Sequence, residues 1–236
     1  MAGITNSTLL RLRGLSDIDA PVALVAALVA ASRVVRARKG QIVLENGVHS
    51  EDVFLIRSGR VRVELLAVEG REVVMRDLLP GQFFGELASI DSGRRSATIT
   101  ALQPSELLLV PALAFRESVA ATPEAATWFF GHLAALARNL TDRVFETSAL
   151  NVKGRIHCQL VRMAAAAGVA DNQSVIEPFP THEDLAALVG THREAVTREL
   201  SYLSANGFII VQRRRLEIVK FVELSMLAQR ARGGEL

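Results

Sequence analysis

The fold of this chain is decided by residues 84–98, which read FGELASIDSGRRSAT. Gly85 carries no Cβ, so the backbone at this point can approach an anion closely. If residues 87–90 form a single helical turn, their free N–H groups point at the same anion. Arg95 follows the next turn, and its guanidinium can pair with a phosphate through two parallel hydrogen bonds. Together these residues predict an anion-binding site.

Two further polar side chains narrow the class of ligand. Ser96 adds a hydroxyl donor, whereas Glu86 cannot favour a phosphate and is better suited to accept hydrogen bonds from ribose hydroxyls. This combination suits a sugar phosphate better than free phosphate. Each half of the stretch alone is also typical of an ordinary surface turn with solvated arginines at positions 94 and 95. Both halves in this order, inside a β-roll, favour the binding site.

The surrounding residues, from about Arg36 to Pro111, have the hydrophobic period of two that is typical of strands. A half-buried strand is indicated at residues 60–65, where charged and aliphatic side chains alternate. Short strands separated by turns predict a compact antiparallel β-roll or barrel. The glycine-containing turn signals lie at residues 39–40, 58–59, 69–70, 80–81 and 92–93.

An uninterrupted apolar run precedes the strands at residues 20–31. A helix needs about 20 apolar residues to span a membrane, and Asp19 and Arg33 flank this shorter run closely. We therefore expect a buried helix. The first residues, MAGITNS, lack the basic start and long apolar core of a signal peptide. The sequence thus predicts a cytoplasmic protein without a membrane partner.

A long helix is predicted to begin at Thr122, Pro123 and Glu124, which are suited to the N-cap, the first position and the first turn. No proline or glycine interrupts the pattern between His132 and Lys153. Such a helix is either an ordinary core helix or one arm of a two-stranded coiled coil, and the sequence favours neither. Its apolar seam consists of Phe129, Leu133, Leu136, Leu140 and Val144.

Beyond residue 152 the pattern predicts a helix, a helix-turn-helix and a β-hairpin wing. The first helix is expected at residues 156–167 and ends at Gly168. Two more helices, at 181–189 and 191–206, are joined at Gly190. The wing is expected from β-rich runs at 208–211 and 216–219, on either side of three arginines at 213–215.

Both helices of the helix-turn-helix have a predicted start. Thr181 with Asp184, and Thr191 with Glu194, have the spacing of a capping box. An arginine near the start of the second helix can donate two hydrogen bonds to a guanine edge, and a carboxylate can accept one from cytosine. Capping alone can also explain Glu194. The polar face of the second helix presents His192, Arg193, Thr197 and Arg198.

The residues Gly85-Glu86-Leu87 and Arg95-Ser96-Ala97 resemble the phosphate-binding cassette of cyclic-nucleotide-binding domains. With the helix-turn-helix, the chain from about Leu9 to about Val222 resembles the cyclic AMP receptor protein and FNR (Crp/Fnr) family of transcription regulators. The resemblance implies an α+β fold with a jelly-roll-like β-roll, a long dimerisation helix and a winged helix-turn-helix. We expect these parts at residues 1–122, 123–152 and 153–236.

The resemblance also implies roles in the nucleotide site. Arg95 would neutralise the cyclic phosphate, with Ser96 assisting. Ala97 completes this part of the cassette. The ribose and phosphate would be held by Gly85, Glu86 and Leu87, and the pocket would be lined by Leu78 and Phe84.

The family contacts the base from the dimerisation helix, where cyclic AMP receptors carry a Thr-Ser pair. Those positions fall on Leu140 and Thr141 in this chain. Thr141 can hydrogen-bond a purine edge and Leu140 cannot, although Thr141 is otherwise an ordinary polar helix position. Cyclic AMP is the expected ligand because it is the commonest in the family. Cyclic GMP, or both nucleotides, is the alternative.

On the DNA side, the resemblance implies that Arg193, Glu194 and Arg198 read the major groove of a palindromic double-stranded operator. A homodimer is the expected assembly, and RNA polymerase is a further partner that the resemblance admits. The wing arginines should contact backbone phosphates and add affinity rather than specificity. The other expected DNA contacts are Thr181, Thr191, His192, Thr197, Arg213 and Arg214.

Other chemistries lack the residues they need. The single cysteine, Cys158, excludes an iron–sulfur cluster built from several thiolates and is expected to be a small core residue. Among the histidines only His49 lies near the β-roll, so we expect neither haem nor another metal. We find no nucleophile–base pair and expect no enzyme. The main rival is the same fold binding DNA without a cyclic nucleotide, or in response to another small ligand.

Overall fold

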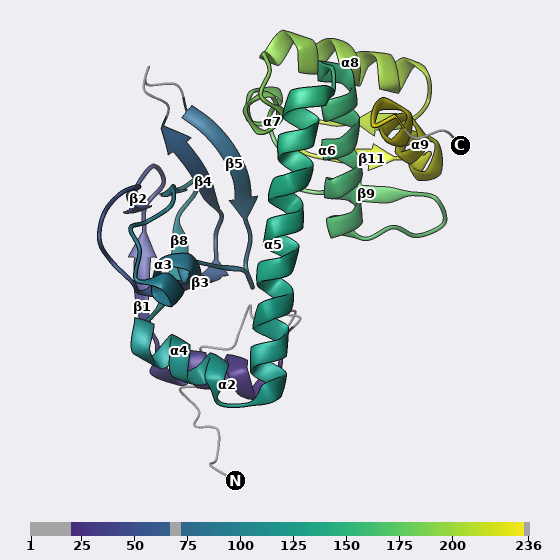
Figure 1. Cartoon of the computed structure of the whole chain (residues 1–236). Coiled ribbons are helices and arrows are strands. Elements are labelled where there is room, and N and C mark those ends of the chain that lie inside the picture. The colour runs from purple at the N-terminus through teal and green to yellow at the C-terminus, as the bar shows by residue number, and fades with distance from the viewer. Residues whose placement is uncertain (1–19, 67–71, 234–236) are drawn as a thin grey trace. The chain divides into compact units, whose positions relative to one another are not determined.

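The computed structural model describes residues 20–66 and 72–233, and the chain divides into two compact units after Ala135. The expected features at Leu9, Asp19 and residues 69–70 lie outside the described residues. Figure 1 labels the helices and most of the strands of both units. In the part of the chain that is described, no helix is both long and apolar enough to cross a membrane.

The first unit contains two four-stranded sheets, with strand orders β1-β8-β3-β6 and β2-β7-β4-β5. Every pairing in them is antiparallel. The strands are β1 (Arg33–Ala37), β2 (Ile42–Leu44), β3 (Val53–Ser58), β4 (Val61–Leu66), β5 (Glu72–Leu78), β6 (Phe83–Phe84), β7 (Thr98–Ala101) and β8 (Ser105–Val110). The helices are α2 (Val22–Ala31), α3 (Glu86–Asp91), α4 (Ala112–Ala120) and the first half of α5 (Pro123–Ala149).

The core of this unit draws on both sheets. Leu107 of β8 and Ile99 of β7 belong to one buried apolar cluster. The next residue of β8, Leu108, packs instead with Val25 and Val29 of α2. Because successive side chains of a strand point to opposite faces, β8 is buried on both sides. The predicted β-roll is therefore confirmed. The helix expected at residues 20–31 forms over Val22–Ala31, but only one face of it is buried, at Leu24, Val25 and Val29.

Helix α5 changes character along its length. In the first unit Phe129 is buried in a cluster with Phe115, and Leu133 packs against that cluster. In the second unit the same seam is exposed, by 42 % at Leu140 and 65 % at Val144. The first half of α5 is thus a core helix, whereas the second half presents apolar side chains that the single chain does not cover.

The second unit consists of the rest of α5, four further helices and a small antiparallel sheet with the strand order β10-β11-β9. Its core includes Ile156, Leu160, Leu185, Leu200 and Ile218. This arrangement confirms the predicted winged helix-turn-helix. The elements are α6 (Val152–Ala167), β9 (Ser174–Ile176), α7 (His182–Val189), α8 (Arg193–Ala205), β10 (Ile209–Val211), β11 (Leu216–Ile218) and α9 (Phe221–Ala231).

Two details differ from the sequence-based expectation. Helix α6 begins at Val152 and not at residue 156, because the Asn151 side chain caps it by accepting a hydrogen bond of 2.9 Å from the Gly154 N–H. Helix α8 begins at Arg193 with His192 as its N-cap, so the capping box predicted at Thr191 is wrong. The Thr191 N–H bonds back to the carbonyl of Ala186, which leaves Thr191 in the turn before the helix.

Candidate functional site

The anion site predicted in the first unit is centred on Gly85, which joins β6 to α3. Its φ of +89° lies in the left-handed region that favours glycine. A Cβ at this position would lie 2.8 Å from Nη1 of Arg95 and 2.9 Å from the carbonyl oxygen of Asp52. Both the backbone conformation and the close packing therefore require glycine. Its carbonyl and Arg95 are held together at the start of α3.

Arg95 is 3 % exposed and is held by three hydrogen bonds. Its Nε donates to Ser50 Oγ at 2.7 Å, Nη1 to the Gly85 carbonyl at 2.8 Å and Nη2 to the Asp52 carbonyl at 2.7 Å. A guanidinium has five N–H donors, so these bonds orient the group without using all of it. None of the carboxylates in the described ranges forms an ion pair with it.

The electrostatics of Arg95 suit an anion. Burial lowers its pKa, while the negative charges of Asp52, Glu86 and Glu51 raise it. An arginine nevertheless stays protonated in a protein, so the site keeps a buried positive charge. A bound phosphate would place a negative charge in direct contact with the guanidinium of Arg95.

Glu86, the first residue of α3, is 3 % exposed. Its Oε1 lies 3.9 Å from Nε2 of His132, and that nitrogen has no hydrogen-bond partner in the described part of the chain. Burial also lowers the pKa of Arg76, and the charge of Glu86 opposes that shift. The predicted carboxylate therefore acts on the buried Arg95 and the half-buried Arg76, and it lies beside the half-buried His132.

The other residues predicted for the nucleotide site are divided between core and surface. Leu78 and Phe84 are each 2 % exposed in the core between the sheets. Leu87 is 38 % exposed, Ser96 is exposed and Ala97 is half-buried. The structure thus brings Gly85, Glu86 and Arg95 together at the start of α3.

The sequence did not identify the residues that orient Arg95. Asp52 takes part through its backbone carbonyl, which any residue type would supply, so no side-chain signal exists. Ser50 takes part through its hydroxyl, but it lies in a polar turn of ordinary composition. His132 is an isolated histidine in a helical pattern, so its sequence context carries no signal for this site.

The residues predicted to contact the base lie in the second unit, on α5. Thr141 is exposed and its Oγ1 donates a hydrogen bond of 3.1 Å to the Ala137 carbonyl in the preceding turn. Leu140 is also exposed. The Thr141 hydroxyl can still accept a hydrogen bond while it donates this one.

The helix-turn-helix has the predicted start at its first helix. Thr181 Oγ1 accepts a hydrogen bond of 3.1 Å from the Asp184 N–H and donates one of 2.7 Å to the Asp184 carboxylate. Gly190, with a φ of +71°, ends α7 in the left-handed conformation. Helix α8 then packs on α7 through buried residues that include Leu185 and Val196.

The polar face of α8 is exposed at Arg193, Glu194, Thr197 and Arg198, and the N-cap His192 is exposed too. Thr197 Oγ1 lies 2.8 Å from Nδ1 of His182 and donates to the Arg193 carbonyl. The hairpin between β10 and β11 carries Arg213 and Arg214, which are exposed. Arg215 is less free, because it lies 3.7 Å from Glu217 and 3.9 Å from Glu177. Two sets of cationic side chains are thus presented, one on α8 and one on the wing.

Comparison with known proteins matches both halves of the chain. Residues 34–122 match the family model described as "Cyclic nucleotide-binding domain". Residues 154–227 match the family model described as "Crp-like helix-turn-helix domain". The two matches cover the β-roll with α4 and the winged helix-turn-helix.

The chain is also similar to whole proteins. It is 31 % identical over 176 residues to a cyclic AMP receptor protein of Thermus thermophilus, covering 72 % of this chain and 76 % of that one. It is 27 % identical over 209 residues to a CRP-like cAMP-activated global transcriptional regulator of Mycobacterium tuberculosis, covering 88 % and 92 %. The fold is similar to a double mutant of CooA from Carboxydothermus hydrogenoformans, with a TM-score of 0.73, 23 % identity and coverage of 96 % and 98 %.

Proposed function

Because the chain belongs to the CRP/FNR family of transcription regulators, we propose that it is a homodimer that binds a palindromic DNA operator in response to a purine cyclic nucleotide. Members of this family are regulators and not enzymes. Cyclic AMP is the preferred candidate, because similar proteins are named as cyclic AMP receptors or as cAMP-activated regulators. Cyclic GMP is the alternative.

The observation that carries the nucleotide half is the buried guanidinium of Arg95 beside Gly85. The cyclic phosphate would accept from Arg95, from Ser96 and from the first N–H groups of α3. Glu86 would accept a hydrogen bond from the ribose hydroxyl. An ionised carboxylate accepts well from a hydroxyl but has no proton to donate to a phosphate. Leu78, Phe84, Leu87 and Ala97 would provide the apolar surroundings, and Thr141 a contact to the base.

The DNA half follows from the exposed face of α8. We propose that Arg193, Glu194 and Arg198 contact base edges in the major groove. A twofold dimer would present two such helices to the two half-sites of a palindrome. RNA polymerase would be a further partner in activation. The proposed phosphate contacts are Thr181, Thr191, His192, Thr197, Arg213 and Arg214.

Calorimetric titration with cyclic AMP and cyclic GMP tests the nucleotide half. We expect the wild type to bind one or both and Arg95→Met to lose about 100-fold or more in affinity, because a charge-assisted pair with phosphate is lost. Arg94→Met is the matched control. Arg94 is the exposed neighbour and donates to the Gly47 carbonyl. It should keep wild-type affinity.

The rival function is tested in the same titration. Leu140 stands where cyclic AMP receptors carry a residue able to contact the base. Because leucine cannot hydrogen-bond a base, DNA binding that needs no nucleotide is the rival to test. If the wild type binds neither nucleotide yet still selects a DNA sequence, the chain is a nucleotide-independent regulator or one that responds to another ligand. If it binds both nucleotide and operator, operator DNA should tighten nucleotide binding by the same factor as the converse.

A further inference from the structure

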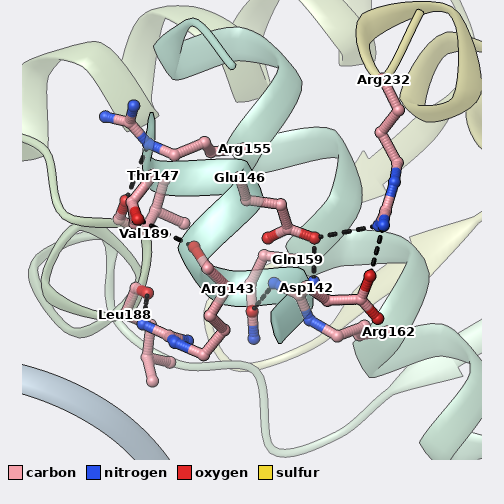
Figure 2. A network of polar contacts seen from close by, with 10 residues as sticks. All are labelled: Asp142, Arg143, Glu146, Thr147, Arg155, Gln159, Arg162, Leu188, Val189 and Arg232. Carbon is pink, nitrogen blue, oxygen red and sulfur yellow. Dashed lines mark hydrogen bonds and ion pairs between the residues drawn. The ribbon is translucent and has the colours of Figure 1, made fainter. Parts of the chain in front are cut away.

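The end of α7 is held by two arginines from neighbouring helices (Figure 2). Nη2 of Arg143, on α5, donates to the carbonyl of Leu188 at 3.2 Å. Nε of Arg155, on α6, donates to the carbonyl of Val189 at 3.0 Å. Nη2 of Arg155 also donates to the carbonyl of Gly190 at 3.2 Å. Three successive carbonyls are thus bound by guanidinium groups.

These bonds complete the hydrogen bonding of the turn. The last carbonyls of an α-helix have no partner within the helix. In α7 the carbonyl of Ala186 accepts from Thr191 N–H at 2.9 Å and that of Ala187 accepts from Gly190 N–H at 3.4 Å. The arginines bind the carbonyls that follow. Their positive charges also suit the negative end of the helix dipole.

Arg155 joins this turn to a second junction. Its Nη1 donates to the carbonyl of Leu150, between α5 and α6, at 2.9 Å. One guanidinium therefore binds both the α5–α6 junction and the turn that leads into α8. Lysine could not replace it, because an ammonium group is a compact charge and not a planar fork.

Arg143 lies beside a network of charged side chains. Burial lowers the pKa of Arg143, the charge of Arg162 lowers it further and that of Glu146 raises it. Glu146 is 3 % exposed and binds Arg162 at 2.5 Å and Arg232 at 3.3 Å (Figure 2). The second half of α5 is thereby tied to α6, α9 and the end of α7.

We propose that Arg143 and Arg155 are positioning residues for DNA reading. They act through the backbone of the turn, and they set the direction in which α8 leaves it and the place of Arg193 at its start. This proposal rests on the proposed function and adds a route by which the second half of α5 controls the recognition helix. Both arginines line a small hollow that is open to solvent.

The test compares specific with non-specific DNA binding. A duplex selected from a random library by the wild type with cyclic AMP, and a scrambled duplex, are titrated at several salt concentrations. Arg155→Met, Arg155→Lys and Arg143→Met should each lower the ratio of the two affinities, by about tenfold for the Arg155 variants. The salt slope should stay that of the wild type. Arg230→Met, at an exposed arginine of α9, is the control and should keep the ratio.

A purely structural role would lower both affinities together in proportion to the unfolded fraction, which thermal unfolding measures. Hydrogen exchange adds a second readout: amides of residues 190–194 should exchange faster in Arg143→Met while those of α6 do not. If Arg155→Met does not fold, Arg143→Met and Arg155→Lys decide. An unchanged ratio in the folded variants overturns the proposal, as does a salt slope reduced by about one, which would indicate a phosphate contact. Failure of the wild type to prefer any duplex would instead overturn the proposed function.

Discussion

Gly85 combines a strained backbone conformation with a close contact, and these two demands can be separated by mutation. Gly85→Ala adds a Cβ within 2.8 Å of Arg95 Nη1 at a φ of +89°. We expect a loss of about 1–2 kcal/mol from the left-handed conformation, together with loss of cyclic-nucleotide binding because Arg95 must move. Thermal unfolding and calorimetry measure the two effects.

Gly40→Ala is the control for this prediction. Gly40 has a φ of +79°, but a Cβ there would have no atom within 4 Å. The variant should lose similar stability and keep its nucleotide affinity. Equal nucleotide affinity in both variants would show that the approach of Gly85 to Arg95 is irrelevant to binding.

The arginines of α8 and of the wing should differ in what they contribute to DNA binding. Arg193→Ala should cost about 1–3 kcal/mol on the selected duplex and relax its sequence preference, because a base contact is lost. Arg213→Ala should weaken binding to all duplexes alike and lower the salt slope by about one. Fluorescence anisotropy at several salt concentrations measures both. If Arg213→Ala relaxed the sequence preference and Arg193→Ala lowered only the salt slope, Arg213 would be the base contact and Arg193 the phosphate contact.

The sequence identified the residues whose side-chain types form a recognisable binding motif. Gly85 and Arg95 were predicted because they suit a bound anion, and Glu86 because a carboxylate can accept hydrogen bonds from a sugar. Arg155 was not, because its partners are backbone carbonyls that come together only in the folded chain. Every residue has a backbone carbonyl. A side chain that binds such carbonyls therefore has no partner that can be recognised by its residue type in the sequence.

The side chain of Thr181 caps the first turn of α7 and should stabilise the helix. Thr181→Ala removes the side-chain acceptor of the Asp184 N–H and should cost about 1 kcal/mol of unfolding free energy. Thr181→Ser keeps the acceptor and should cost little. Thr191→Ala should also be nearly neutral, because α8 is not capped by a side chain. Urea unfolding of the three variants measures the differences, and a large loss in Thr191→Ala would restore the capping box there.

Helices and strands with a clear hydrophobic periodicity were predictable from the sequence. Elements that depend on pairing or packing with distant segments were not. The strands of the β-roll and helices α7 and α8 follow from hydrophobic spacing and turn residues. The short strand β9 was missed because only three residues pair with β11. Helix α6 starts earlier than predicted because its cap, Asn151, precedes the apolar pattern. Helices α4 and α9 also went unpredicted.

The whole molecule is proposed to be a homodimer, and the exposed seam on the second half of α5 is where a partner chain would pack. Val144 is 65 % exposed there. Val144→Glu should shift the protein toward monomer, because a charge would be buried at the interface. Val22→Glu, at a position of α2 that is 81 % exposed, is the control and should leave assembly unchanged. Sedimentation velocity over a range of concentrations measures the shift, and a monomeric wild type would contradict the proposal.

Whole-chain properties said least about function. A formal net charge of +2 does not indicate a nucleic-acid partner, because the arginines of α8 and of the wing are offset by acidic residues elsewhere. The arrangement of charge on exposed faces, and not its sum, carries the information.

Cys158 has a practical consequence for attaching spectroscopic probes to this protein. It is the single cysteine of the chain, it is 5 % exposed, and burial raises the pKa of its thiol. A protonated, shielded thiol reacts slowly with alkylating reagents. A cysteine introduced at an exposed position would therefore be the preferred attachment point for a fluorophore or spin label. The natural residue need not be replaced before distances within a dimer are measured spectroscopically.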